Sequence, residues 1–123
     1  MDNQKRVAMM GRTKRFALAI IRLYSSLPRT VLEQVLGRQI LRSGTSVGSH
    51  YREACRAKAK ADFVSKIEGA LQELEETIYW LELLYEANIV KVARVEPLMA
   101  EGNELISIFV TVVKSVKGVP KAG

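Results

Sequence analysis

His50, Glu53 and Cys55 are the residues of this 123-residue chain whose types could support nucleophilic chemistry. A histidine and a glutamate three positions apart can hydrogen-bond on a helix, and a nearby cysteine could act as the nucleophile. At helical spacing, however, Cys55 lies about 100° around the helix from Ala54, so the three side chains do not converge on one face. We therefore interpret His50 as a core or interface histidine with a satisfied hydrogen bond. Glu53 is interpreted as a structural partner for an arginine or a backbone amide.

Metal chemistry is not expected either. A di-iron or di-manganese helical bundle needs two Glu-x-x-His pairs, but the chain has a single histidine, preceded three positions earlier by Val47. His50 and Cys55 are too few ligands for a tetrahedral zinc site. We expect a protein that is not an enzyme, with no catalytic residues, no metal ion and no cofactor.

The segment 38–56, RQILRSGTSVGSHYREACR, offers a different kind of chemistry, the binding of anions. At helical spacing its arginines share one face with Thr45 and Ser49, and a narrow seam of small and apolar residues lies opposite. Basic side chains that follow a phosphate backbone bind in a sequence-tolerant and steeply salt-dependent way. The alternative is a solvated face. The candidate nucleic-acid-binding residues are Lys14, Arg15, Arg38, Arg42, Arg52, Arg56, Lys58 and Lys60.

Charge is distributed unevenly along the chain. Residues 1–60 contain 13 Lys and Arg against 3 Asp and Glu, whereas residues 61–123 contain 6 against 10, and the formal net charge is +6. Such asymmetry suits a nucleic-acid-binding protein, and it equally suits a protein whose halves attract each other or a sister subunit.

Hydrophobic periodicity predicts the elements that position these residues. We expect amphipathic helices over about 12–27, 30–57, 62–87 and 94–117, between a flexible arm at 1–11 and a flexible tail at 118–123. Four such helices with short connections form an all-α, antiparallel up-down-up-down four-helix bundle.

Local signals set the helix ends. Pro28 ends the first helix, and Thr30 with Glu33 forms a capping-box pattern at the start of the second. Pro97 is expected in the first turn of the fourth helix. Gly44 and Gly48 indicate a close approach of a neighbouring element or a local bend.

The third helix is apolar on nearly every side toward its end. Its predicted inner face comprises Phe63, Ile67, Leu71, Leu74, Ile78, Leu81 and Tyr85. The predicted flank that could meet the arginines of an antiparallel neighbour comprises Glu68, Gln72, Glu75, Tyr79, Glu82 and Glu86. A helix that is hydrophobic all round is usually buried all round, which one small bundle cannot achieve. We therefore infer a homo-oligomer whose interface is formed by Trp80, Leu83, Leu84 and Ala87.

Cysteine usage and hydropathy bear on location. Cys55 is the only cysteine, so a reducing compartment is expected. No run approaches the roughly 20 apolar residues of a membrane span, and the basic N-terminus lacks a signal-peptide cleavage site. The sequence predicts a cytoplasmic protein with no membrane partner.

Two stretches, RSGTSVGSHYREA (42–54) and DFVSKIEGALQELEETIYWLELL (62–84), follow a predicted helix that closes in SSLP. This arrangement, from about residue 16 to 108, resembles the bacterial four-helix-bundle proteins first noticed as products of intervening sequences in large-subunit ribosomal RNA genes. Arg42, Ser43, Ser46, Glu53 and Ala54 fit the family's motif, whereas His50 stands where the family usually has asparagine.

The resemblance implies a left-handed bundle that assembles into a ring-shaped homopentamer. It also implies kinship with the accessory proteins of diversity-generating retroelements, which are basic and bind nucleic acid and a reverse transcriptase. No catalytic residue is carried over from the family.

Two hypotheses follow. The first is a non-enzymatic oligomeric bundle that binds RNA or DNA through the second helix, with a role as an accessory to a reverse transcriptase or ribosomal RNA. The second is a structural or protein-interaction module with no nucleic-acid role, in which the arginines pair with glutamates between subunits. A hydrolase built on His50, Glu53 and Cys55 is the weakest alternative, because their geometry fails.

Overall fold

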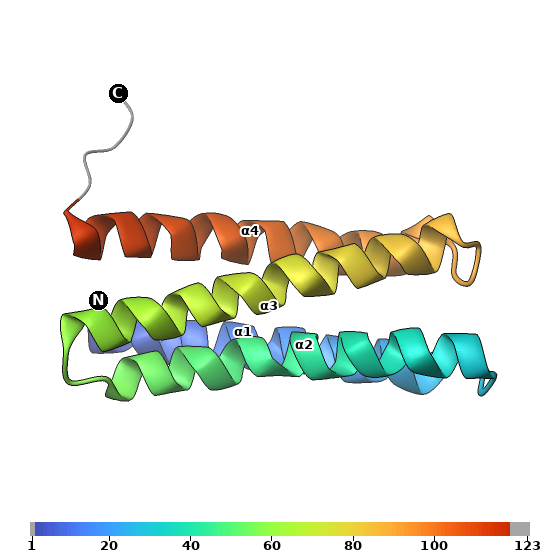
Figure 1. Ribbon diagram of the computed structural model, residues 1–123, viewed down its shortest axis with the longest axis horizontal. Coiled ribbons are helices and arrows are strands. Elements are labelled where there is room, and N and C mark those ends of the chain that lie inside the picture. Colours follow the sequence, from blue (N-terminus) through green and yellow to red (C-terminus); the bar gives the residue numbers. More distant parts are fainter. Residues whose placement is uncertain (1, 119–123) are drawn as a thin grey trace, which may run out of the picture.

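Four long helices make up most of residues 2–118, the part of the chain that the computed structural model describes. They are α1 (Asn3–Ser26), α2 (Val31–Arg56), α3 (Lys60–Glu86) and α4 (Val92–Lys117). Successive helices run antiparallel and are joined by short connections (Figure 1), and no strand occurs within the described residues. The predicted all-α, up-down-up-down four-helix bundle is confirmed.

The helices surround one core but do not contact one another equally. α3 lies between α2 and α4, and the α2–α3 contact is the most extensive of the four (Figure 1). α1 packs closely on α2 and only sparsely on α4. Tyr51 of α2 and Phe109 of α4 stack in the middle of the core, with ring centroids 5.6 Å apart.

Most of the predicted helix ends are correct. α1 ends at Ser26, two residues before Pro28, and Asn88 takes the left-handed conformation (φ 60°) just after α3. Thr30 is the residue that precedes α2, but its side chain makes no capping hydrogen bond, so the predicted capping box with Glu33 is wrong. Gly118 ends α4 with φ 71°, a conformation that favours glycine.

The N-terminal arm predicted at 1–11 is also wrong, because α1 already begins at Asn3. The Asp2 carboxylate accepts a hydrogen bond from the Lys5 amide at 2.8 Å, and Met9 is buried against the core. A side-chain cap and one apolar contact hold a turn that hydrophobic periodicity alone does not reveal. Of the predicted tail at 118–123, residues 119–123 lie outside the described part.

α4 begins at Val92, two residues earlier than predicted. This places Pro97 inside the helix and past its first turn, which corrects the prediction. A proline at this position removes one backbone hydrogen bond. Val95 and Leu98 on either side of it are buried in the core, and this packing offsets the loss.

The inner face of α3 is rotated from the predicted one. The residues that are buried on α3 are Val64, Ile67, Ala70, Leu74, Thr77, Leu81 and Leu84. Small side chains at Ala70 and Thr77 allow α2 and α3 to approach closely, and the hydroxyls of Thr77 and Ser43 hydrogen-bond at 2.7 Å inside the core. The larger Leu71 and Ile78, which were predicted at the inner face, are only half-buried.

Candidate nucleic-acid interface

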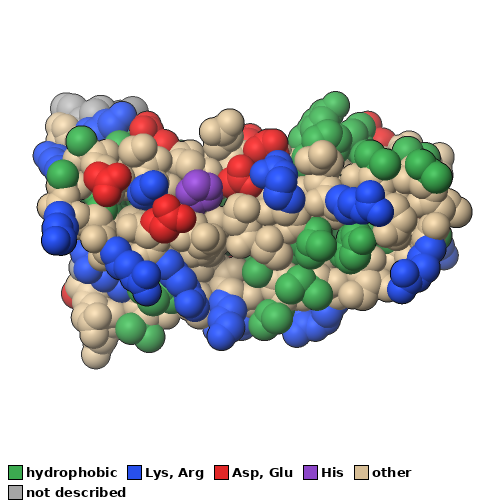
Figure 2. Space-filling view, turned by 60° about the horizontal axis from the view of Figure 1, so that its bottom comes forward, with side chains coloured by type: hydrophobic (Ala, Val, Ile, Leu, Met, Phe, Trp, Pro, Cys, Tyr) green, Lys and Arg blue, Asp and Glu red, His purple; other side chains and the backbone are tan. Residues whose placement is uncertain are grey.

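The eight predicted basic residues are all exposed, and they belong to α1, to α2 and to the segment 58–60 that leads into α3. Lys14 and Arg15 are exposed on α1, and the four arginines are exposed on α2. Lys58 lies in the connection that follows α2, and Lys60 is the first residue of α3. Figure 2 shows Lys and Arg side chains along the lower half of this face, with the acidic side chains mainly above them. The acidic side chains are therefore grouped on one half of this face, whereas cations occur on both halves.

Arg42 is engaged within its own chain. Its guanidinium donates to the Glu73 carboxylate at 3.0 Å and to the Glu76 carboxylate at 3.1 Å, both on α3. An arginine held by two carboxylates has little charge left to offer a phosphate. These glutamates belong to neither the predicted inner face nor the predicted flank, because the rotation of α3 carries Glu73 and Glu76 to α2 in place of Glu75 and Glu82.

Arg52 has a different environment, because it lies toward α1 and not toward α3. It lines a shallow groove between α1 and α2, of about 380 Å³, together with Lys14. In the described part of the chain neither side chain makes an ion pair. Two cations on neighbouring helices thus share one hollow with no carboxylate between them. We call this hollow the α1–α2 groove.

Glycines of α2 explain the shape of the groove. A Cβ on Gly48 would lie 3.1 Å from the Thr13 hydroxyl, and a Cβ on Gly44 would lie 2.7 Å from Ile20 Cγ1. The predicted close approach at these glycines is therefore correct, and the approaching element is α1. Since the two helices nearly touch here, only a shallow floor remains between the side chains that rise on either side.

The remaining predicted cations continue the basic surface. Arg15, Arg38, Arg56, Lys58 and Lys60 are exposed, and none of them forms an ion pair among residues 2–118. From Arg38 to Arg56 the helix rises about 27 Å. We define the basic face as the seven of the eight predicted cations that form no ion pair among the described residues: Lys14, Arg15, Arg38, Arg52, Arg56, Lys58 and Lys60.

Arg12 is a second arginine that pairs with carboxylates of its own chain, and the sequence analysis did not identify it. Arg12 of α1 donates two hydrogen bonds to Glu101 of α4, at 2.7 and 2.8 Å, and lies 3.0 Å from Glu104. The hydrogen bonds from Arg12 lower the pKa of Glu101, and the two carboxylates raise the pKa of Arg12. This pairing joins two neighbouring helices that have few close contacts.

The structure does not bring His50, Glu53 and Cys55 together. The imidazole of His50 lies against Gly69 of α3, where a Cβ would come within 3.0 Å of Nδ1. Glu53 pairs with Lys66 at 3.1 Å, a lysine and not the arginine or backbone amide expected. His50 Nδ1 is buried and has no hydrogen-bond partner in the described structure, so the satisfied hydrogen bond predicted for it is wrong.

Cys55 lies on another side of α2 and interacts with Tyr51. Burial, and next the hydrogen bond with Cys55, raise the pKa of the Tyr51 phenol. Within residues 2–118, no three His, Cys, Asp or Glu side chains are placed where they could share a metal ion. No helix in that range is long and apolar enough to cross a membrane.

The residues predicted to form an oligomer interface have unequal environments. Leu84 is fully buried in the core of its own chain, which corrects its assignment, since a residue inside the bundle cannot contact another subunit. Trp80 and Leu83 are half-buried, and Ala87 is exposed. Trp80 meets Tyr79 edge to face, with ring centroids 5.2 Å apart.

The sequence reasoning missed apolar residues on α2 beside Trp80. Val31, Leu32 and Val35 are 81%, 55% and 51% exposed. Because Arg42 meets Glu73 and Glu76, a step of two turns along each antiparallel helix places Val35 beside Trp80 and Leu83. We define the apolar end patch as Val31, Leu32, Val35, Tyr79, Trp80 and Leu83.

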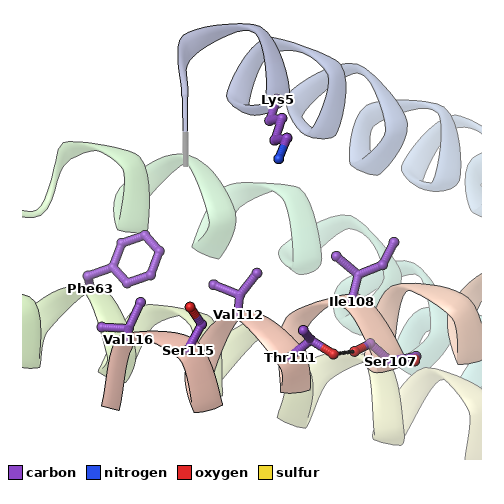
Figure 3. Close-up of a pocket in the computed structure, with 8 residues that line it drawn as sticks. All are labelled: Lys5, Phe63, Ser107, Ile108, Thr111, Val112, Ser115 and Val116. Carbon is purple, nitrogen blue, oxygen red and sulfur yellow. Dashed lines mark hydrogen bonds between the residues drawn. The ribbon is translucent and has the colours of Figure 1, made fainter. Parts of the chain in front are cut away.

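A separate hollow of about 480 Å³ lies where α1 and α4 diverge, beside the start of α3. Figure 3 shows Phe63, Ile108, Val112 and Val116 along it, with Lys5 of α1 above them. Its lining is mainly apolar and includes a single cation. This hollow therefore lacks the paired cations of the α1–α2 groove.

Comparison with known proteins is consistent with this geometry. The sequence model of the 23S rRNA-intervening sequence protein family matches residues 5–111. A crystal structure of a protein of unknown function from the S23 ribosomal protein family of Bacteroides thetaiotaomicron superposes with a TM-score of 0.83 and is 36% identical, covering 89% of this chain and 98% of that one. No curated protein sequence matches significantly.

Proposed function

The chain belongs to the 23S rRNA-intervening sequence protein family, and we propose that it is a non-enzymatic, oligomeric protein that binds RNA or DNA through its basic face. The observation that carries this proposal is the separation of the cations into two groups. Arg12 pairs with carboxylates of α4 and Arg42 with carboxylates of α3, whereas the cations of the basic face form no ion pair among the described residues. Unneutralised cations that follow one side of a helix pair suit a phosphate backbone.

Self-association is the second part of the proposal. The apolar end patch leaves three aliphatic side chains of α2 more than half exposed beside two aromatic rings. Exposed apolar groups that gather in this way are typical of protein contact surfaces. A ring of copies, as the family resemblance implies, would bring several basic faces together and multiply a modest charge. The homopentamer and a partner reverse transcriptase or ribosomal RNA belong to this proposal, as does a cytoplasmic location.

The alternative function is a protein-interaction module without a nucleic-acid role. The ion pairs of Arg42 with Glu73 and Glu76 favour it, because they put one arginine of the predicted row into a structural contact. In this case the other cations would meet acidic residues of a partner protein or of a neighbouring subunit.

Salt-dependent binding separates the two functions. We expect wild type to bind a labelled oligonucleotide in fluorescence anisotropy, with an affinity that falls steeply as NaCl rises. Replacement of both Arg38 and Arg56 by alanine should reduce the slope of log K against log salt by about two.

The matched control replaces Lys91 and Lys114, two exposed lysines outside the basic face, and removes the same charge. The slope of this control should match wild type. Failure of wild type to bind any oligonucleotide, or loss of assembly in place of binding in the arginine variant, would favour the interaction module.

A further inference from the structure

The α1–α2 groove is a hollow of the basic face that combines cations, apolar surface and hydroxyl side chains. Lys14 and Arg52 stand on opposite helices at its sides, while Met10, Ala17 and Gly48 supply apolar surface. Lys58 and Lys60 line another hollow together with Arg6, and Lys60 lines a further one with Lys117, but neither of these hollows contains a hydroxyl side chain. A ligand that fits the groove must offer both an anion and a flat or apolar part.

The hydroxyl groups that line the groove differ in whether they can donate a hydrogen bond to a ligand. The Thr13 and Thr45 hydroxyls donate their protons to helix carbonyls, at 3.0 Å to Met9 and 2.7 Å to Leu41. Their protons are therefore unavailable to a ligand. Ser49 also lines the groove and makes no hydrogen bond within residues 2–118, so its hydroxyl can donate. Lys14, Arg52 and Ser49 together offer donors to one anionic group.

The size of the groove limits what can enter. At about 380 Å³ it lies at the low end of pockets that hold small organic ligands, which run from roughly 300 to 1,000 Å³. A nucleic-acid duplex cannot enter such a hollow, because its bases are stacked inside and its phosphates would meet only the cations at the rim. A single strand can turn one nucleotide out of its stack and into the groove.

We propose that the α1–α2 groove seats one nucleotide of a single-stranded nucleic acid. Its phosphate lies between Lys14 and Arg52 and accepts a hydrogen bond from Ser49, and its base and sugar cover Met10 and Ala17. The planar guanidinium of Arg52 can also stack on the base, as arginine commonly does with unpaired bases. This inference rests on the proposed function and adds to it a preference for single strands over duplexes.

A substitution that fills the groove without changing charge tests the inference directly. Ala17→Phe places a ring in the hollow, whereas Leu18→Phe, one position along on an exposed side of α1, leaves the groove open. The probes are a labelled oligouridylate strand and the duplex of the same length that it forms with oligoadenylate. Ala17→Phe should weaken binding of the strand about tenfold. Duplex binding should stay within about twofold of wild type, and Leu18→Phe should change neither.

Charge variants give a second test that does not depend on filling the groove. Lys14→Ala and Arg52→Ala should each weaken single-strand binding by about tenfold, because each removes a charged donor to phosphate. Arg22→Ala removes the same charge from an exposed position of α1 outside the groove and should cost clearly less. Both lysine and arginine variants change exposed side chains, so they should fold even if Ala17→Phe does not.

The outcomes separate the groove from the proposed function. Wild type that binds neither probe overturns both. Wild type that binds, with Ala17→Phe unchanged or with strand and duplex weakened equally, overturns the nucleotide seat alone. Equal losses of single-strand affinity in Lys14→Ala, Arg52→Ala and Arg22→Ala would also overturn the nucleotide seat. They would show that the groove acts only as part of a general positive surface.

Discussion

α2 packs against two neighbours by different means. On the side of α1 the contact is made by glycines, with Gly44 against Ile20 and Gly48 against Thr13, and the cations beside it have no carboxylate partners in the described structure. On the side of α3 the contact is polar inside, through Ser43 and Thr77, and is flanked by the ion pairs of Arg42. We call these contacts the α1–α2 seam and the α2–α3 seam.

The difference shows that the position of an arginine on a helix does not decide its role. Arg42 and Arg52 belong to the same sequence row, yet α3 presents Glu73 and Glu76 to the first of them. Farther along the seam α3 presents Lys66, which Glu53 neutralises. The neighbouring helix, and not α2 itself, determines which cations remain free to bind an anion.

The α2–α3 seam changes from polar to apolar two turns beyond Arg42, and the largest expected effect concerns this apolar end. Trp80→Asp places a charge in the apolar end patch and should dissociate the assembly to monomers in light scattering. Val35→Asp, at a position that is 51% exposed, should do the same with less risk to the fold. The reason is that a desolvated carboxylate at a contact surface has no partner there.

Leu18→Asp is the control for assembly, since Leu18 is 41% exposed but lies outside the apolar end patch. It should leave the oligomer intact. An unchanged assembly in folded Trp80→Asp and Val35→Asp, verified by circular dichroism, would remove this patch from the interface.

The next largest expected effect tests whether the close approach of the two helices stabilises the α1–α2 seam. Gly44→Val should destabilise the protein by about 2–3 kcal/mol, because its Cβ would lie within 3 Å of the branched Ile20 side chain and must force the helices apart. Urea unfolding at fixed protein concentration measures this change. Gly11→Val is the matched control, since a Cβ there meets only the flexible end of Arg15, and it should stay within about 0.5 kcal/mol of wild type. Equal changes in stability for Gly44→Val and Gly11→Val would show that α1 and α2 can move apart here without a loss of stability.

Much of the α1–α2 seam could be predicted from the sequence. Small residues spaced four apart, Gly44 and Gly48, indicate close approach because glycine is unfavourable in a helix unless packing requires it. The arginines of α2 lie outward for the same periodic reason. What the sequence left open was the identity of the neighbour, which depends on the packing of the whole bundle.

The α2–α3 seam could not be predicted in the same way. Residues 78–85 of α3 are apolar on most sides, so the pattern is compatible with several rotations of the helix. The rotation is fixed by a buried polar contact, Thr77 with Ser43, and by the small Ala70. The prediction placed Leu71 and Ile78 on the inner face. With that rotation Leu84 was expected at the surface, and the glutamates expected to meet Arg42 were the wrong ones.

A third seam, between α1 and α4, sharpens the comparison because it has few close contacts and one strong ion pair. Glu101→Gln should destabilise the protein by about 1 kcal/mol at neutral pH, since the side chains of Arg12 and Glu101 are 26% and 31% exposed. Glu104→Gln should cost less, because Glu104 is 64% exposed.

The pH dependence of this effect has a defined sign. The folded protein lowers the pKa of Glu101 from its ordinary value of 4.5, chiefly through the hydrogen bonds from Arg12. As pH falls below 4.5 the unfolded chain takes up a proton before the folded one, so the stabilisation by this pair declines and is lost once the folded carboxylate is protonated. Urea unfolding across this range should show the difference between wild type and Glu101→Gln shrinking toward zero. A constant difference would contradict the pairing.

The smallest expected effect separates Arg42 from Arg52. Arg42→Ala should destabilise the bundle by less than about 1 kcal/mol, because the Arg42 side chain is 49% exposed and solvent screens its ion pairs. It should leave the salt slope of nucleic-acid binding unchanged, since no phosphate contact is lost, whereas Arg52→Ala should lower that slope by about one.

The converse change gives the stricter test. Replacing Glu73 and Glu76 together by glutamine removes both carboxylates from Arg42 and releases its guanidinium toward the basic face. If the carboxylates of α3 are what excludes Arg42 from binding, this variant should bind an oligonucleotide more tightly than wild type and show a steeper salt slope. Replacing Arg42 by alanine in this double variant should then abolish the gain in slope. A gain that survives without Arg42 would mean that the glutamates act only through net charge, and that the identity of the neighbouring helix matters less than its total charge.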